Sequence, residues 1–139
     1  MKVPYTNFKT RTGDDTAIGG CGFIGGEWKE IDTPMIFEGK KVVVFALPGA
    51  FTPTCSTYQL PDFERLAPEF LNEEGFDAIY CVSVNDAFVM NAWGRDLAIK
   101  NVKMIPDGCG TFTRSMGMLV NKPKQGFGMR SWRYSAIIN

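Results

Sequence analysis

The sequence predicts an α/β sandwich with a mostly parallel central sheet. Two runs of β-branched and aromatic residues, 41–47 and 76–84, have the continuous apolar pattern of strands that are buried on both faces of a sheet. A stretch with helical features follows each run, over 53–72 and 87–100. Strands that alternate with helices are typical of a parallel sheet whose faces are covered by helices.

The residues before the first of these strands give weaker signals. The first ten residues alternate loosely between polar and apolar and predict an early strand. Residues 13–30 are rich in glycine and aspartate, which predicts a loop with a short strand near Trp28. Pro34 suits the first position of a single helical turn, because its missing N–H is not needed there.

The helix over 53–72 has a clear start and two interruptions. Thr52 is a good N-cap, and Pro53 fits the first helical position. Pro61 and Pro68 lie inside the helix, and each removes a backbone donor. They must therefore bend or interrupt it.

The remaining elements complete a single domain over residues 1–139. Asn85 and Asp86 cap the helix over 87–100. After it we expect a short strand over 102–105, a short helix over 111–118 and a final strand over 132–138. A chain of this length typically has one core.

Composition and charge exclude several classes of function. Apolar residues make up 45% and charged residues 22% of the chain, as in a globular domain. Fifteen Lys plus Arg balance fifteen Asp plus Glu, so no net charge attracts nucleic acid, a membrane surface or an acidic substrate. No apolar run has the length of a signal peptide or the roughly 20 residues of a membrane helix, so the expected location is the cytoplasm; a processed organellar protein would have the same features.

Cysteine spacing and the absence of histidine narrow the chemistry. The four cysteines are Cys21, Cys55, Cys81 and Cys109, with no close pair of the kind that binds zinc or forms a thioredoxin-type dithiol. Because the chain has no histidine, it has no Ser-His-Asp triad, no Cys-His protease pair and no histidine-ligated metal.

Cys55 is the candidate nucleophile. With Thr52 as the N-cap, Cys55 is the third residue of the helix, among backbone N–H groups that have no partner within the helix. The partial positive charge at a helix N-terminus stabilises an anion. We therefore expect this sulfur to react as a thiolate, which is the nucleophilic form.

The sequence around Cys55 resembles that of a known family. Residues 48–55 read Pro-Gly-Ala-Phe-Thr-Pro-Thr-Cys and match the PxxxTxxC signature of peroxiredoxins. Further blocks agree in the same order, over 82–90, 92–95, 105–108 and 126–135. From about residue 40 onward the chain is similar to type II, fifth-class peroxiredoxins, including the peroxiredoxin domain of peroxiredoxin-glutaredoxin hybrids.

This resemblance implies a fold and a set of site residues. The fold is a thioredoxin-like three-layer sandwich with a mixed central sheet. Cys55 would be the peroxidatic cysteine, Thr52 would hydrogen-bond the thiolate and the peroxide, and Pro48 would shield the pocket. Arg133 resembles the family arginine that stabilises the thiolate and the developing negative charge.

The resemblance also implies a reaction and its partners. The substrates would be hydrogen peroxide and small alkyl hydroperoxides, and the reaction needs no metal and no cofactor. The Cys55 sulfenic acid must then be reduced by a thiol. Glutaredoxin with glutathione, or thioredoxin, is the implied reductant, and a homodimer is the implied assembly.

Other roles remain open for several residues. Arg130 competes with Arg133 for the site. Cys81 lies in an apolar strand, where burial explains it better than a resolving role does. Cys109 should lie on a loop without a function, and Cys21 lies in a glycine-rich loop without a visible partner.

Members of the family continue beyond the Arg-Tyr-Ser segment at 133–135 with a further strand and a C-terminal helix. We therefore expect that strand and helix to be missing, which leaves an unpaired sheet edge and uncovered apolar surface. Three other functions remain possible for a chain of this sequence: a peroxide-sensing module, an inactive fragment, and a general disulfide oxidoreductase of the same fold. The last normally needs a second cysteine close to Cys55, and the residues after it provide none.

Overall fold

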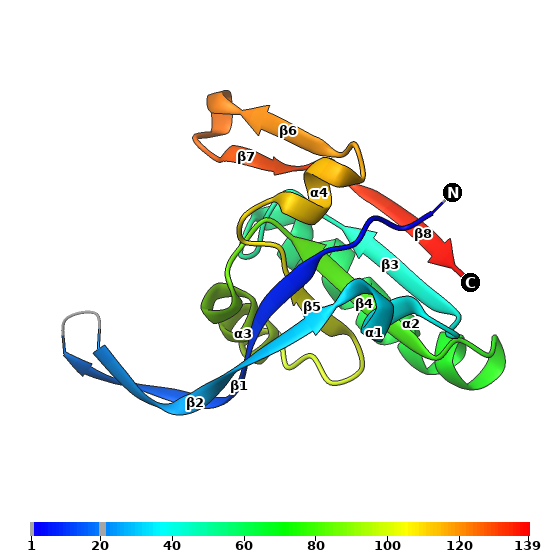
Figure 1. Cartoon of the computed structure of the whole chain (residues 1–139), viewed down its shortest axis with the longest axis horizontal. Helices are drawn as coiled ribbons and strands as arrows, with labels where there is room; N and C mark the ends of the chain where they lie inside the picture. Colours follow the sequence, from blue (N-terminus) through cyan, green and yellow to red (C-terminus); the bar gives the residue numbers. More distant parts are fainter. Residues whose placement is uncertain (1, 20–21) are drawn as a thin grey trace.

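The computed structural model describes residues 2–19 and 22–139 and contains the predicted α/β sandwich (Figure 1). The central sheet is built from β3 (Val42–Ala46), β4 (Ala78–Ser83), β5 (Lys103–Pro106) and β8 (Tyr134–Ile138). Its strand order is β5-β4-β3-β8. Strands β3, β4 and β5 are parallel, and β8 is antiparallel to β3, so the sheet is mixed as the resemblance implies.

Helices cover both faces of this sheet. One face packs against α2 (Leu60–Pro68) and α3 (Ala87–Asp96), the other against α1 (Thr33–Phe37) and α4 (Thr111–Ser115) (Figure 1). Strand β3 alternates between the two cores: Phe45 belongs to the cluster with α2 and α3, and Val44 to the other. Each fully buried side chain of this kind contributes about 1.5–3 kcal/mol. The two-faced burial predicted for residues 41–47 is confirmed.

The sequence predicts a loop over 13–30 with a short strand near Trp28, but residues 13–19 and 22–30 instead form most of a long antiparallel hairpin (Figure 1). The hairpin consists of β1 (Asn7–Gly19) and β2 (Gly22–Asp32). Its pairing shifts register around Gly13, which has a φ of 80°, and Gly25 on the other strand has a φ of 85°. These glycines serve β-bulges, which need backbone conformations that other residues rarely adopt. Glycine content therefore indicates irregular pairing here.

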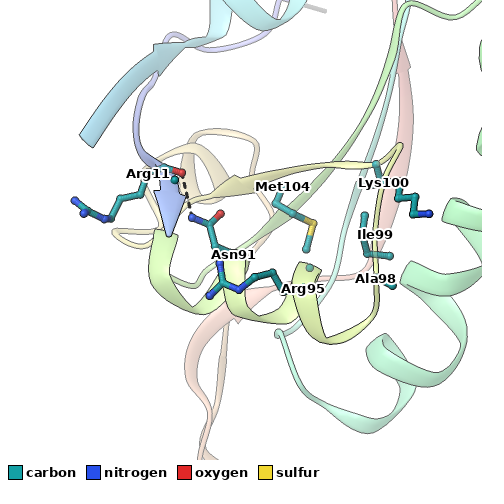
Figure 2. Close-up of a pocket in the computed structure, with 10 residues that line it drawn as sticks. Arg11, Asn91, Arg95, Ala98, Ile99, Lys100 and Met104 are labelled. Carbon is teal, nitrogen blue, oxygen red and sulfur yellow. Dashed lines mark hydrogen bonds between the residues drawn. The ribbon is translucent and has the colours of Figure 1, made fainter. Parts of the chain in front are cut away.

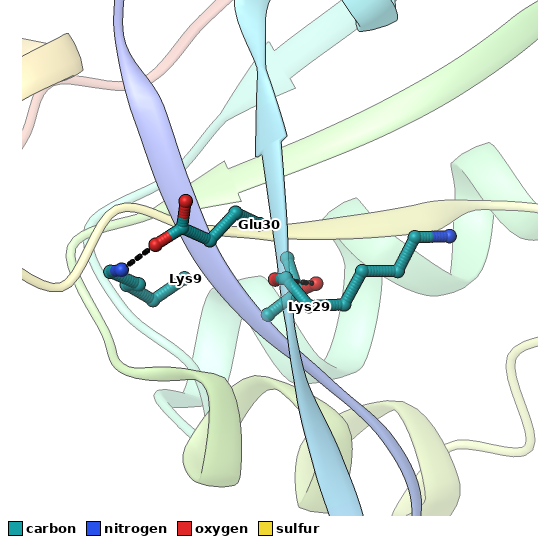
Figure 3. A network of polar contacts seen from close by, with 4 residues as sticks. Lys9, Lys29 and Glu30 are labelled. Carbon is teal, nitrogen blue, oxygen red and sulfur yellow. Dashed lines mark hydrogen bonds and ion pairs between the residues drawn. The ribbon is translucent and has the colours of Figure 1, made fainter.

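Polar contacts join the two strands near the base of the hairpin (Figure 3). Lys9 and Glu30 lie directly opposite each other and form an ion pair. The hydroxyl of Thr10 donates a 2.7 Å hydrogen bond to the carbonyl of Lys29, whose side chain extends away from Lys9 and Glu30 (Figure 3). Cross-strand pairs of this kind contribute about 0.2–1 kcal/mol each. Cys21 lies outside the described residues.

The prolines alter the helix predicted over 53–72. Its two ends are as predicted, but the segments Cys55–Gln59 and Glu69–Glu73 are π-helical. In the first of them the backbone N–H of Leu60 reaches back to the carbonyl of Cys55, five residues before it. Pro61 has no N–H to give to the preceding turn, and its ring pushes that turn open. Proline thus sets the wide turn on which Cys55 lies.

Two helices end earlier than predicted. Helix α3 ends at Asp96, and Ala98 shortly after it has a φ of 53° in the left-handed region. Helix α4 ends at Ser115, and Gly117 beyond it has a φ of 73°. No helix in the described part of the chain is both long enough and apolar enough to cross a membrane.

A second, shorter hairpin has no counterpart in the prediction. It consists of β6 (Leu119–Lys122) and β7 (Gly128–Ser131), joined through a 3-10 turn at Pro123–Gln125. It projects at the end of the central sheet toward which β3 and β4 run (Figure 1). The final strand begins at Tyr134, so Arg133 precedes it and does not lie within it.

Glu64 joins α2 to the loop that precedes β5. Its carboxylate accepts hydrogen bonds of 2.6–3.0 Å from the backbone N–H groups of Lys100, Asn101 and Val102 and from the side-chain amide of Asn101. Burial acts to raise the pKa of this carboxyl, but the hydrogen bonds outweigh it and hold the pKa below its usual value of 4.5.

Glu64→Gln is expected to lower the free energy of unfolding at pH 7 by about 1–3 kcal/mol, because three backbone donors lose a charged acceptor. Since the folded-state pKa is lowered, the stabilisation is complete above the unfolded-state pKa and is lost as the pH falls through the folded-state pKa. Urea unfolding should show a large difference at pH 7 that shrinks below about pH 4. A difference that is independent of pH would contradict this role.

Strand β8 forms one edge of the central sheet. Among the described residues its only strand partner is β3. Ile137 on this strand is 66% exposed and borders two apolar grooves against α2 and the helical turn after it. The uncovered sheet edge expected from the sequence is therefore present.

Candidate active site

Cys55 lies where the chain leaves the carboxyl end of β3 and enters the helix toward α2. In open α/β sheets this is the end at which ligands bind. The backbone N–H of Ser56 donates to the carbonyl of Thr52 at 2.9 Å, so the helix begins where predicted. The side chain of Cys55 is buried, with 1% of its surface exposed.

Arg133 reaches the sulfur of Cys55. Its Nη1 donates to Sγ at 3.6 Å and also to Oε1 of Gln59, one turn further along the same helix. Gln59 is held in turn, because its Nε2 donates to the carbonyl of Ala46 at the end of β3, at 3.3 Å. Gln59 thus fixes the guanidinium beside the thiol. No pattern in the sequence indicates this role for Gln59.

Thr52 and Pro48 lie in the turn between β3 and the helix. The hydroxyl of Thr52 donates to the carbonyl of Gly49 at 2.7 Å, which uses its single proton and leaves the oxygen lone pairs as acceptors. Pro48 is half-buried in this turn. Contact of either residue with a bound peroxide remains a prediction.

Two further side chains hold that turn in place. Asn85 accepts hydrogen bonds from the backbone N–H of Ala50 at 3.0 Å and from the hydroxyl of Ser83 at 2.6 Å. Arg130 lies against Gly49, where an added Cβ would come within 2.9 Å of Nη1. Only glycine therefore allows the guanidinium to pack so closely. Arg130 supports the turn, while Arg133 contacts the sulfur.

The helix that carries Cys55 is also tied to α3. The indole N–H of Trp93 donates to the hydroxyl of Ser56 at 2.9 Å, and the Trp93 side chain is fully buried. Asp86, at the start of α3, is the N-cap and accepts from the backbone N–H of Val89. The capping predicted for this helix is therefore confirmed for Asp86, while Asn85 serves the active-site turn.

The other described cysteines occupy different environments. Cys81 is fully buried in β4, and burial raises the pKa of its thiol well above the usual value, with a further contribution from the charge of Cys55. Its predicted burial is confirmed, and it stays a neutral thiol near pH 7. Cys109 is exposed and free on a loop, as predicted.

A separate pocket of about 480 Å³ lies between the long hairpin, α3 and the loop before β5 (Figure 2). It is lined by Arg95 and Met104 among others, and the side-chain amide of Asn91 donates to the carbonyl of Arg11 at its rim. None of the predicted site residues lines it. This pocket therefore lies apart from the thiol.

Comparison with known proteins agrees with the fold. The family model described as Redoxin matches residues 23–139. The chain is 59% identical over 138 residues to a peroxiredoxin from Sinorhizobium fredii, covering 99% of this chain and 71% of the relative. It is 50% identical over 137 residues to a hybrid peroxiredoxin from Haemophilus influenzae, covering 99% of this chain and 52% of the relative.

A solved structure has the same fold. Reduced Prx3 from Vibrio vulnificus in complex with hydrogen peroxide aligns with a TM-score of 0.83 and 37% identity, over 100% of this chain and 76% of that one. The chain spans between about two thirds and three quarters of the length of most of the relatives and structures compared.

The fold and the thiol site define a redoxin domain of the thioredoxin-like class. Within that class the chain belongs to the peroxiredoxin family, whose members are thiol-dependent peroxidases. The resemblance found in the sequence is thereby confirmed, including its similarity to a hybrid peroxiredoxin.

Proposed function

We propose that this protein reduces hydrogen peroxide and small alkyl hydroperoxides through Cys55 as the peroxidatic cysteine. The thiolate attacks one oxygen of the O–O bond, forming an S–O bond while the O–O bond breaks. The second oxygen leaves with the bonding electrons and takes up a proton to become water or an alcohol. Cys55 is oxidised to a sulfenic acid and the peroxide is reduced.

One observation carries this proposal: Nη1 of Arg133 lies 3.6 Å from the sulfur of Cys55. A fixed guanidinium stabilises the thiolate and the charge that develops on the leaving oxygen, the kind of preorganised electrostatic effect that usually contributes most to catalysis. The hydroxyl oxygen of Thr52 accepts a hydrogen bond from the peroxide and orients it, and Pro48 excludes water from the turn. The peroxide complex of the Vibrio relative supports this choice of substrate.

An external thiol returns Cys55 to its reduced form in this proposal. Cys81 is fully buried within β4, which argues against rapid attack on a sulfenic acid without rearrangement. Glutaredoxin with glutathione, or thioredoxin, is the reductant that we propose. A reducing compartment such as the cytoplasm supplies these thiols and suits a protein with free cysteines.

A homodimer completes the proposal. A homodimer is the assembly that the family resemblance implies, and we propose it for this chain. Sedimentation equilibrium should then give twice the chain mass, and a monomer at all concentrations would reject the dimer.

The test of the peroxidase is peroxide consumption by the wild-type protein with each reductant system supplied in turn. Sustained turnover with at least one of them is expected, and intact mass should show Cys55 oxidised within seconds by about one equivalent of peroxide. A single oxidation without turnover would identify a sensor. Absence of rapid oxidation would identify an inactive fragment and reject the proposal.

A further inference from the structure

The net charge of zero conceals an uneven distribution of charge along the chain. From Gly108 to Asn139 there are five basic residues and no acidic one, whereas residues 1–107 have ten basic and fifteen acidic residues. The basic segment contains α4, the hairpin β6–β7 and Arg133. A positive region therefore adjoins the thiol of an otherwise acidic protein.

Aromatic and cationic side chains alternate on this hairpin and just after it. The ammonium of Lys122 lies 4.8 Å from the ring centroid of Trp132, and the guanidinium of Arg130 lies 5.5 Å from that of Phe127. Trp132 directly precedes Arg133, which contacts the sulfur. The positive charge of the hairpin therefore extends to the site.

Large apolar side chains on the segments that carry the site and the hairpin are exposed. They are Phe51, Tyr58, Met129 and Trp132, with exposed fractions of 51%, 65%, 49% and 50%. Phe51 directly precedes Thr52, Tyr58 follows Cys55 by three residues, Met129 lies on β7, and Trp132 directly precedes Arg133. Exposed aromatic residues, Met and Arg are the residue types enriched in protein interfaces.

Two carboxylates that precede this segment accept hydrogen bonds within the fold and form no ion pair with the cations of the hairpin that the structure records. Asp107 is buried, and its carboxylate accepts from the backbone N–H groups of Phe112 and Thr113 and from the hydroxyl of Thr113. Asp86 is occupied as the N-cap of α3. Because the segment over 108–139 has five basic residues and no acidic one, a partner of opposite charge suits this face.

We propose that the hairpin β6–β7, with Lys122 beside Trp132 and Lys124 in its turn, is the docking face for a reductant protein whose reactive thiol lies in an acidic surface. This inference rests on the proposed function, because it concerns the reduction of oxidised Cys55. Positive charge around the site attracts the acidic partner and speeds encounter, and the exposed aromatic residues provide the contact area.

The docked thiol completes a balanced exchange. Its sulfur attacks the sulfur of the Cys55 sulfenic acid, an S–S bond forms, the S–O bond breaks, and the departing hydroxide takes the thiol proton to give water. The partner's sulfur is oxidised and the sulfur of Cys55 is reduced. A second thiol of the reductant then attacks the mixed disulfide and releases Cys55.

The test uses two synthetic peptides as probes, each with one cysteine, flanked by glutamates in one and by lysines in the other. Wild-type protein is first oxidised with peroxide, and formation of the mixed disulfide is followed by intact mass. The acidic peptide is expected to react at least about 10-fold faster at low salt. This preference should vanish between about 0.01 M and about 1 M salt, as the Debye length falls from about 30 Å to about 3 Å.

Two variants test whether the preference for the acidic peptide depends on the hairpin β6–β7. The double change Lys122→Glu and Lys124→Glu should reverse the ratio of the two rates, a ratio that is measured on one protein and is insensitive to partial unfolding. Lys29→Glu is the control, because Lys29 lies on β2 of the long hairpin and its side chain extends away from that strand (Figure 3). The ratio of the two peptide rates for this variant should equal that of the wild type.

Each other outcome overturns the docking proposal. Equal rates for the two peptides, or an unchanged preference for the acidic peptide in the double variant, would show that the hairpin β6–β7 is not the docking face. A change in the sedimentation mass of the double variant, without a change in the rate ratio, would assign the face to a second copy of the chain. If peroxide fails to oxidise Cys55 in the first step, the proposed function itself is wrong, so the two failures are distinguishable.

Discussion

Cys55→Ser is expected to abolish the rapid reaction with peroxide, lowering the rate of oxidation by at least about 10³-fold. A serine hydroxyl stays protonated near neutral pH, and nothing beside it acts as a base, because Arg133 can only donate and the chain has no histidine. The substitution changes one buried atom and should leave the fold intact. Stopped-flow mixing with peroxide, followed by intact mass, measures the loss.

The remaining cysteines provide the controls. Cys109→Ser changes an exposed thiol on a loop, and the variant should be oxidised at the wild-type rate. Cys81→Ser tests the buried thiol in β4, and it should leave the first oxidation fast because burial keeps that thiol protonated. Rapid oxidation of Cys55→Ser would show that another sulfur reacts with peroxide, and the proposed mechanism would be abandoned.

The fold could be predicted where burial dominates the pattern. Strands β3 and β4 are buried on both faces, so almost every side chain in them is apolar and the signal is unambiguous. The long hairpin β1–β2 lies largely outside the two cores, and the glycines at its bulges give it the composition that is typical of a loop. The short hairpin β6–β7 is not predicted for a similar reason, since only one of its eight strand residues is buried and they carry no alternating pattern.

The site could be predicted only in part. Cys55 is identified by local sequence, because its position in the first helical turn determines its chemistry. Arg133 lies 78 residues further along and is identified only through the family resemblance. Gln59 and Asn85 are missed by both routes, because an amide side chain has no distinctive pattern and its role depends on which groups the fold brings within hydrogen-bond distance.

Arg133→Gln is expected to slow the oxidation of Cys55 by about 10²–10³-fold, the usual cost of removing one preorganised donor from a developing charge. The guanidinium provides both a full positive charge beside the sulfur and donors in a fixed fork, and the amide retains only weaker, neutral donors. The variant should still be oxidised, but slowly. Stopped-flow rates at one fixed pH give the loss, and circular dichroism checks the fold.

Arg114→Gln is the matched control for this prediction, because Arg114 is an exposed arginine on α4 of the same basic segment and should oxidise at the wild-type rate. Gln59→Met removes the acceptor that holds Arg133, so we expect a smaller loss, of up to about 10-fold. Because Gln59 acts through Arg133, the double variant should be no slower than Arg133→Gln alone, a non-additivity that a purely structural effect would not give. If Arg133→Gln reacts as fast as the wild type while Arg130→Gln does not, the catalytic guanidinium is that of Arg130, and the contact with the sulfur is structural.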